Sequence, residues 1–344
     1  MRNSTIVVLV GGCLSLWMLT PSLAHAQSID INLDAAKAKE YNLDVNGLED
    51  NLNSAVSDQL NIGDQTAFLE DMANAAALAT KGMGVDYASN PKRFVFGGSF
   101  GTAVNGVGAS FGRGDYSVPE GGFSLSASAM VGINLGFGNE DSPLSRFRLY
   151  ANGLVLGTSG ESFDASVYNY GAHLQFQVFK PRISAALEWG GLALTSGYEL
   201  SGYVMSLSSK LPVETQQDGV DLKWDALGTY DITSVSDTIP VEVSTNIRIL
   251  VTTLYVGGGA DIVNVGRATS DISLGGDISA SAFGSTETLG DISVSLDGEG
   301  IADDVVPRLF AGLQADILFI KAYGQLNVGL NESFGGHVGL RVVL

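Results

Sequence analysis

A strict alternation of apolar and polar positions runs through most of the chain after about residue 93. Between Phe123 and Phe137 every odd position is apolar, whereas the even positions hold mainly Ser, Gly and Asn. A β-strand places these two sets on opposite faces, whereas a helix would scatter them around its axis. The same period of two recurs in six further segments: 146–155, 168–178, 182–189, 308–317, 320–328 and 338–344. The pattern predicts antiparallel strands with one apolar and one polar face.

Segment length and polar composition favour a membrane barrel over a soluble sandwich. Several alternating stretches reach about ten residues, which is enough for a tilted strand to cross the hydrocarbon core. The polar faces are rich in Ser, Asn, Gln and Gly, as in a barrel interior. Lipid offers no hydrogen-bond partners, so such a sheet must close on itself. We predict an all-β fold, an antiparallel transmembrane β-barrel of about 14 strands (alternatively 12) over residues 92–344, with a short N-terminal helical segment.

Connections between the predicted strands alternate in length. Tight turns at 180–181 and 318–319 contrast with longer loops at 105–121, 156–163 and 331–336. With Leu344 placed in the periplasm, the tight turns are periplasmic and the longer loops are external, as in outer-membrane barrels. Aromatic residues near the predicted strand ends could form interfacial girdles: Phe123, Phe137, Phe147, Phe179 and Trp189.

The middle of the chain gives five expected strands, at 198–209, 219–230, 241–264, 268–282 and 286–297. Asp-Ile-Ser recurs there, starting at Asp271, Asp277 and Asp291. The spacing is unequal and the regular glycine-aspartate period of a calcium-binding β-helix is missing. We interpret the recurrence as similar strand and turn chemistry.

The predicted N-terminal domain, residues 27–91, has a different pattern. Apolar residues recur every four positions in two stretches, as in amphipathic helices. The first stripe is Leu48, Leu52, Val56 and Leu60; the second, after Asp64, is Phe68, Met72, Ala76 and Ala79, with Gly82 where the helix would end. Two interpretations remain open, a helical prelude in the periplasm and a plug inserted in the barrel lumen.

Residues 1–26 have the three parts of a secretory signal peptide. Arg2 provides a positive start, an apolar stretch ends near Leu19, and Ala24-His25-Ala26 is a small-x-small cleavage site. A membrane anchor and a lipoprotein signal at Cys13 are the alternatives. Cleavage after Ala26 would remove the only cysteine and change the net charge from −19 to −20, because Arg2 is lost. A strongly acidic protein lacks the positive surface that nucleic-acid binding requires.

The chain resembles Gram-negative outer-membrane β-barrel proteins. The resemblance rests on Ala24-His25-Ala26, on the alternating segments and on the ending Val338-Gly339-Leu340-Arg341-Val342-Val343-Leu344. That ending is similar to the signal read by the barrel-assembly machinery, although it closes on Leu344 instead of an aromatic residue. A helical segment before a barrel also resembles the fatty-acid transporter type, but that family's N-terminal Asn-Pro-Ala stretch is missing. The resemblance implies the cell outer membrane, its lipid and the assembly machinery as location and partners.

Charged and amide residues on the polar faces are the candidate site. In the predicted register they face the lumen, where they either line a pore or balance charge inside a filled barrel. The candidates are Arg146, Arg148, His173, Gln175, Arg182, Glu188, Arg248, Asp316 and Lys321.

We expect no enzyme activity, cofactor, metal or catalytic residue. After signal removal the histidines are His173, on the polar face of its strand, and His337, at a loop edge without a visible partner. The predicted function is a porin-like channel or transporter for small solutes, hydrophobic ones included if the helical segment acts as a hatch. The alternative is a structural or surface-interaction protein with acidic external loops.

Overall fold

The computed structural model describes residues 27–41, 43, 47, 65–106, 121–184, 187–217, 220–282 and 285–344. The expected signal peptide and the first expected helical stripe, Leu48 to Leu60, therefore lie outside the described residues. Among the residues that are described, no helix is both long and apolar enough to cross a membrane.

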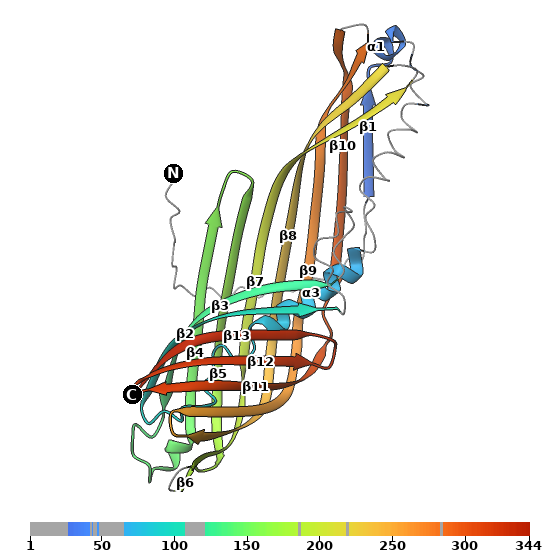
Figure 1. Cartoon of the computed structure of the whole chain (residues 1–344). Helices are drawn as coiled ribbons and strands as arrows, with labels where there is room; N and C mark the ends of the chain where they lie inside the picture. Colours follow the sequence, from blue (N-terminus) through green and yellow to red (C-terminus); the bar gives the residue numbers. More distant parts are fainter. Residues whose placement is uncertain are drawn as a thin grey trace.

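A ring of antiparallel strands forms the body of the molecule (Figure 1). In the described part of the chain ten strands pair in sequence around this ring. They are β2 (Phe94–Asn105), β3 (Gly122–Asn134), β4 (Phe147–Ser159), β5 (Phe163–Phe179), β7 (Leu187–Gln217), β8 (Val220–Ile249), β9 (Thr252–Ala282), β11 (Val305–Ile317), β12 (Ile320–Gly329) and β13 (Phe334–Val343). The ring closes where β13 pairs with β2, with Phe334 opposite Val104. The predicted closed antiparallel barrel is confirmed.

Three strands are about twice as long as the others and continue beyond the ring. β7, β8 and β9 have 31, 30 and 31 residues. Their far ends join β10 (Ser285–Ile301) and β1 (Gln27–Leu33) in a sheet that projects from one end of the barrel (Figure 1). We call this part the extension: residues 208–217, 220–232 and 266–282 with β10 and β1. The short strand β6 (Arg182–Ser184) pairs with the near end of β7.

These long strands explain why the strand number predicted from the sequence, 14 or 12, was wrong for the ring. The expected strands 219–230 and 241–264 are not separated by a turn at Pro240, because β8 runs through that residue. The expected break between 264 and 268 is a bulge: Asp237 pairs with Val265 and Thr238 with Val263, which leaves Asn264 as an extra residue of β9. A bulge bends a strand without ending it, and β10 lies outside the ring.

The ring strands turn apolar residues outward and polar residues inward. On β8, Val241, Val243 and Ile247 are exposed, whereas Glu242 and Ser244 are buried. Exposed aliphatic and aromatic residues continue around the other ring strands, among them Phe100, Val131, Leu149, Leu174, Leu194, Leu254, Leu309, Leu326 and Val338. An apolar exterior around a polar interior is the arrangement of a membrane barrel.

The C-terminal residue and the tight turns share one end of the barrel. Asp316 N donates to Val251 O and Val343 N donates to Phe319 O, which places the turns 250–251 and 318–319 beside the chain end. The end of β2 and the connection 330–333 lie at the other end, since Phe334 pairs with Val104; this connection is shorter than the expected loop 331–336. The extension projects from this end of the barrel (Figure 1). The expected loop 156–163 is shorter than predicted, because β4 and β5 are joined by residues 160–162 alone.

The described part of the chain begins on the extension with β1, at the end opposite to Leu344. β1 pairs with β10, with Ile31 opposite Ile292, and α1 (Ala35–Glu40) follows at its tip (Figure 1). α3 (Gln65–Ala79) matches the second expected helix and contacts β10 together with the ring strands β2, β3, β8, β9 and β13. Residues 80–93 then lead to β2. The chain therefore passes through the ring before it builds the first ring strand.

Candidate functional site

The lumen is occupied by residues 65–91, which we call the lumen segment. Its apolar side chains are buried against inward-facing residues in separate clusters: Leu69, Met72, Ala73 and Ala76 near Tyr203 and Ile232, Leu78 and Ala79 near Ala103, and Val85, Tyr87 and Ala88 near Tyr150, Tyr255 and Phe310. Strands on all sides of the ring take part. The geometry is that of a plug.

Lys81 is the first of two charged groups that bind the lumen segment to the wall. Its Nζ lies 2.6 Å from Glu199 Oε2 on β7 and 3.8 Å from Asp261 Oδ1 on β9. The same ammonium group donates to Thr238 Oγ1 on β8, and Thr80 Oγ1 donates to Glu199 Oε2 at 2.9 Å. The Lys81 side chain is fully buried, so its charge is balanced by the protein alone.

A second buried charge cluster continues from Asp261 across the wall. Arg308 on β11 pairs with Asp261, with Nε 2.7 Å from Oδ2, and with Glu242 on β8. Tyr87 of the lumen segment donates its hydroxyl to Glu242, and Asn246 Nδ2 donates to Tyr87 O at 2.7 Å. Wall and lumen segment thus share one network of hydrogen bonds and ion pairs.

Asp86 is the charged group of the lumen segment on the other side of the ring. Arg341 on β13 donates from Nη1 to Asp86 Oδ1 at 3.2 Å and from Nη2 to Val85 O at 2.6 Å. The guanidinium group lies 3.7 Å from the centre of the Tyr323 ring. Lys81 therefore neutralises acidic groups of the wall, and Asp86, five residues further along the chain, neutralises a basic one.

Five of the nine residues predicted to line the lumen are buried inside it, and the other four lie near the end of the barrel or outside it. Arg148, His173, Gln175, Asp316 and Lys321 are buried, with Arg148 Nη1 2.9 Å from Gln175 Oε1 and Lys321 Nζ 3.2 Å from Asp316 Oδ1. Glu188 and Arg248 lie near the end of the barrel, half-exposed, and pair at 3.7 Å. Arg182 is exposed over the Trp189 ring, and Arg146 ends the short 3₁₀ helix η1 (Pro143–Arg146).

The sequence did not identify the residues at the centre of this site. Lys81, Asp86, Glu199, Glu242 and Asp261 were not among the candidates, because their partners of opposite charge lie between 47 and 255 residues away along the chain. One signal was present: Lys81 is a lone charge within an Ala- and Gly-rich run.

His337 was assigned incorrectly to a loop edge. β13 begins at Phe334, so His337 is a buried strand residue, and its ring lies 5.7 Å from that of Tyr323, edge to face. Within the described residues, no group of His, Cys, Asp and Glu is arranged to hold a metal ion.

The barrel wall has a seam between β3 and β4. These strands pair only from Ala129 to Asn134, although β3 extends back to Gly122 and β4 extends on to Ser159. A cavity of about 10 Å³ lies between α3 and the wall here, lined by Ala76, Thr80, Ser126, Tyr168 and Tyr203 among others. A cavity of roughly this size holds at most a single water molecule. The lumen is closed beside the seam.

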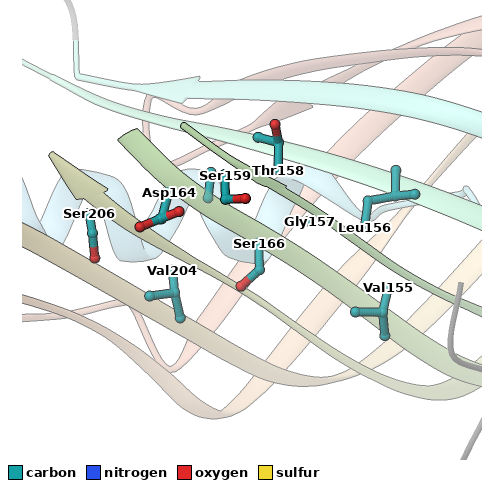
Figure 2. A pocket seen from close by; sticks show the side chains of 10 residues that line it. Val155, Leu156, Gly157, Thr158, Ser159, Asp164, Ser166, Val204 and Ser206 are labelled. Carbon is teal, nitrogen blue, oxygen red and sulfur yellow. The ribbon is translucent and has the colours of Figure 1, made fainter. Parts of the chain in front are cut away.

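A larger groove of about 380 Å³ lies on the upper parts of β4, β5 and β7. Figure 2 shows its lining side chains, which include Val155, Asp164, Ser166, Val204 and Ser206. Most of the residues that line the groove have small side chains. The groove follows the β4–β5 hairpin, which forms one edge of the seam.

Comparisons with known proteins give weak structural matches. The chain is similar to a neisserial surface protein, NspA, with 12% identity, coverage of 75% of this chain and 100% of that chain, and a TM-score of 0.22. It is also similar to the monoaromatic hydrocarbon channel CymD, with 11% identity, coverage of 79% and 98%, and a TM-score of 0.25. For the Ralstonia pickettii toluene transporter TbuX these values are 8%, 79%, 99% and 0.24.

A comparison with curated protein sequences gave no match. A family model described as Lsa36-like matches residues 24–344, nearly the whole chain. The chain belongs to the Lsa36-like family.

Proposed function

We propose that this protein is an outer-membrane β-barrel that transports small solutes and that the lumen segment is its gate. The observation that carries the proposal is the ionic contact between the lumen segment and the wall through Lys81 and Asp86. A structural filler could be wholly apolar. Charged contacts are reversible in water, because each group regains hydration when the segment moves.

The seam gives this gate a route for apolar solutes. Where β3 and β4 do not pair, movement of α3 would enlarge the cavity lined by Ala76 and Tyr168 toward the outside of the wall. A solute leaving there would enter lipid without passing the charged residues deeper in the lumen. Small hydrophobic solutes are therefore the substrate class that the seam favours.

Conductance in planar bilayers tests the gate. We expect the full chain to be closed most of the time, and a variant lacking residues 28–90 to conduct. In the full chain, Lys81→Met combined with Asp86→Asn should increase the open fraction, because both ionic contacts are lost together.

The control is Lys223→Met, which removes an exposed ion pair with Asp225 in the extension and should leave gating unchanged. Heat-modifiable migration on gels shows whether each variant forms a folded barrel. If all variants are folded but none conducts, transport is contradicted. Equal conductance of the full chain and the deletion variant would contradict gating while leaving a pore.

A second candidate function is surface interaction through the acidic face of the extension. Asp231, Asp271 and Asp297 lie directly opposite one another on three neighbouring strands, and Asp277 lies opposite Asp291. If this is the function, neutralising these residues should change envelope integrity or attachment without changing permeability.

A further inference from the structure

One half of the barrel rim at the C-terminal end is apolar. The turn between β8 and β9 consists of Leu250 and Val251, and the turn between β11 and β12 consists of Leu318 and Phe319. Leu318 is 84% exposed and Leu250 is 77% exposed. With Leu344, which is 57% exposed, these turns form what we call the apolar rim.

The backbone of both turns is of the kind that usually selects other residues. Leu250 and Leu318 each have a φ of 55°, in the left-handed region. In these two-residue turns only the first residue has a positive φ, and hairpin turns of that kind favour Gly at that position, because leucine is strained there. In water, Asn or Gly would adopt this backbone conformation with less strain than leucine and would be better hydrated. Leucine at both positions indicates surroundings in which a polar side chain costs more than the strain.

All four carbonyl oxygens of the turns are bonded from within the protein. Arg248 Nε donates to Leu250 O at 3.2 Å and Lys321 Nζ donates to Leu318 O at 3.0 Å. Val251 O accepts from Asp316 N, and Phe319 O accepts from Val343 N. Hydrocarbon requires this internal satisfaction of backbone oxygens, whereas water would supply partners itself.

The other half of the same rim is charged. Lys92 Nζ and Glu140 Oε1 form an exposed ion pair at 2.7 Å, and Lys180 Nζ donates to Glu140 O. Strand length agrees with this asymmetry. β12 and β13 have 10 residues each, close to the minimum of roughly 9–11 for a tilted membrane strand. In the apolar rim, the turn between β11 and β12 must therefore itself reach the hydrocarbon boundary.

We propose that the apolar rim is immersed in lipid hydrocarbon, so that the membrane covers the turns of β8–β9 and β11–β12 but leaves the Lys92–Glu140 half in water. The occupant is lipid because the rim continues, without a polar interruption on the outer face, into the exposed belt at Ile317, Leu313 and Ile320. The barrel is then tilted in the bilayer toward this side. The inference rests on the proposed membrane location.

Spin labels in lipid nanodiscs test it, since both faces of the bilayer are accessible there. Single cysteines replace Leu250, Leu318, Leu313 and Asp141 one at a time in the full chain carrying Cys13→Ser. Leu313 reports the belt and Asp141 reports the charged half of the rim. We expect nitroxides at 250 and 318 to collide severalfold more often with oxygen than with a water-soluble nickel chelate, as at 313, and the reverse at 141.

Each other outcome has a separate meaning. If 250 and 318 resemble 141 while 313 stays in lipid, the apolar rim is in water and the inference is wrong, although the barrel is embedded. If 313 is also reached by the chelate, the proposed membrane location fails. Dipolar broadening between labels at 318 would show a second copy of the chain on the rim and would overturn the lipid assignment.

Discussion

The barrel and the extension are built from the same three long strands, yet their faces have opposite polarity. On β8, the even positions from Val220 to Asn246 are buried, except for the partly buried Tyr230. In the barrel they are polar, as at Glu242, Ser244 and Asn246; in the extension they are apolar, as at Leu222, Trp224 and Ala226. The exposed odd positions change the other way, from Val243 and Ile247 to Asp221 and Lys223.

With the barrel in the proposed membrane location, the inversion corresponds to a change of solvent along one continuous strand. An exposed apolar face is stable against lipid, whereas an exposed acidic face needs water. The change occurs near Asp237, which accepts hydrogen bonds from Tyr198 Oη at 3.0 Å and from Asn264 Nδ2 at 3.3 Å. A tyrosine that is apolar at one end and hydrogen-bonded at the other suits a membrane interface. The bulge at Asn264 on β9 lies at the same level.

We expect the largest difference in stability effect between the two regions when one lysine in each, Lys81 or Lys223, is replaced by methionine. Lys81→Met removes the partner of Glu199 and Asp261 inside the barrel and should destabilise the protein by about 3–5 kcal/mol, because it leaves buried charges uncompensated. Lys223→Met in the extension should have no measurable effect, because both partners of that pair are exposed. Urea unfolding in lipid vesicles, followed by gel migration, measures both. Equal effects would mean that the lumen is hydrated.

The apolar core of the extension should be independent of the barrel. Trp224 is buried among Leu222, Ile278 and Ile292, and its Nε1 donates to Gly276 O at 3.1 Å. Trp224→Ala should cost about 3–5 kcal/mol locally, because a large cavity opens. We expect rapid proteolysis of the extension and unchanged resistance of the barrel. Loss of heat-modifiable migration in this variant would instead show that the two regions unfold together.

A charge on the outer face of β8 should distinguish the two solvents directly. Val243 in the barrel and Leu227 in the extension are similarly exposed on the same face of the same strand. Val243→Arg should cost about 2–4 kcal/mol if it lies near the bilayer midplane. Leu227→Arg should be close to neutral, because it stays in water. Unfolding midpoints of the two variants in vesicles give the comparison, and similar midpoints would place both residues in the same solvent.

The sequence predicted the elements that depend on local pattern. Period-two alternation identified the ring strands of the C-terminal part, and four-residue spacing identified α3 from Phe68 to Ala79. The continuation of β8 past Pro240 was not predictable from alternation, because a bulge or strand proline looks like a turn in sequence. The sequence shows that polarity shifts between Trp224 and Val243. The shift can be interpreted as an inversion of the two faces only once both residues are known to lie on one continuous strand. The pairing of Lys81 with Glu199 depends on the ring closing around the lumen segment.

The smallest expected effect concerns the acidic rows of the extension. Asp271 lies directly opposite Asp231 on β8 and Asp297 on β10, an arrangement that the recurring Asp-Ile-Ser segments help to create. Like charges directly opposite in a sheet are destabilising, by roughly 0.2–1 kcal/mol for a pair. Asp271→Asn should therefore stabilise the extension in low salt, and the gain should shrink as salt screens the repulsion.

Ser273→Asn, on the same face of β9, is the matched control and should give no salt-dependent gain. Hydrogen exchange of β9 measures the difference. If Asp271→Asn destabilised the extension at low salt, the carboxylates would be attracting a cation instead of repelling one another, and the acidic face would be a binding surface in its own right.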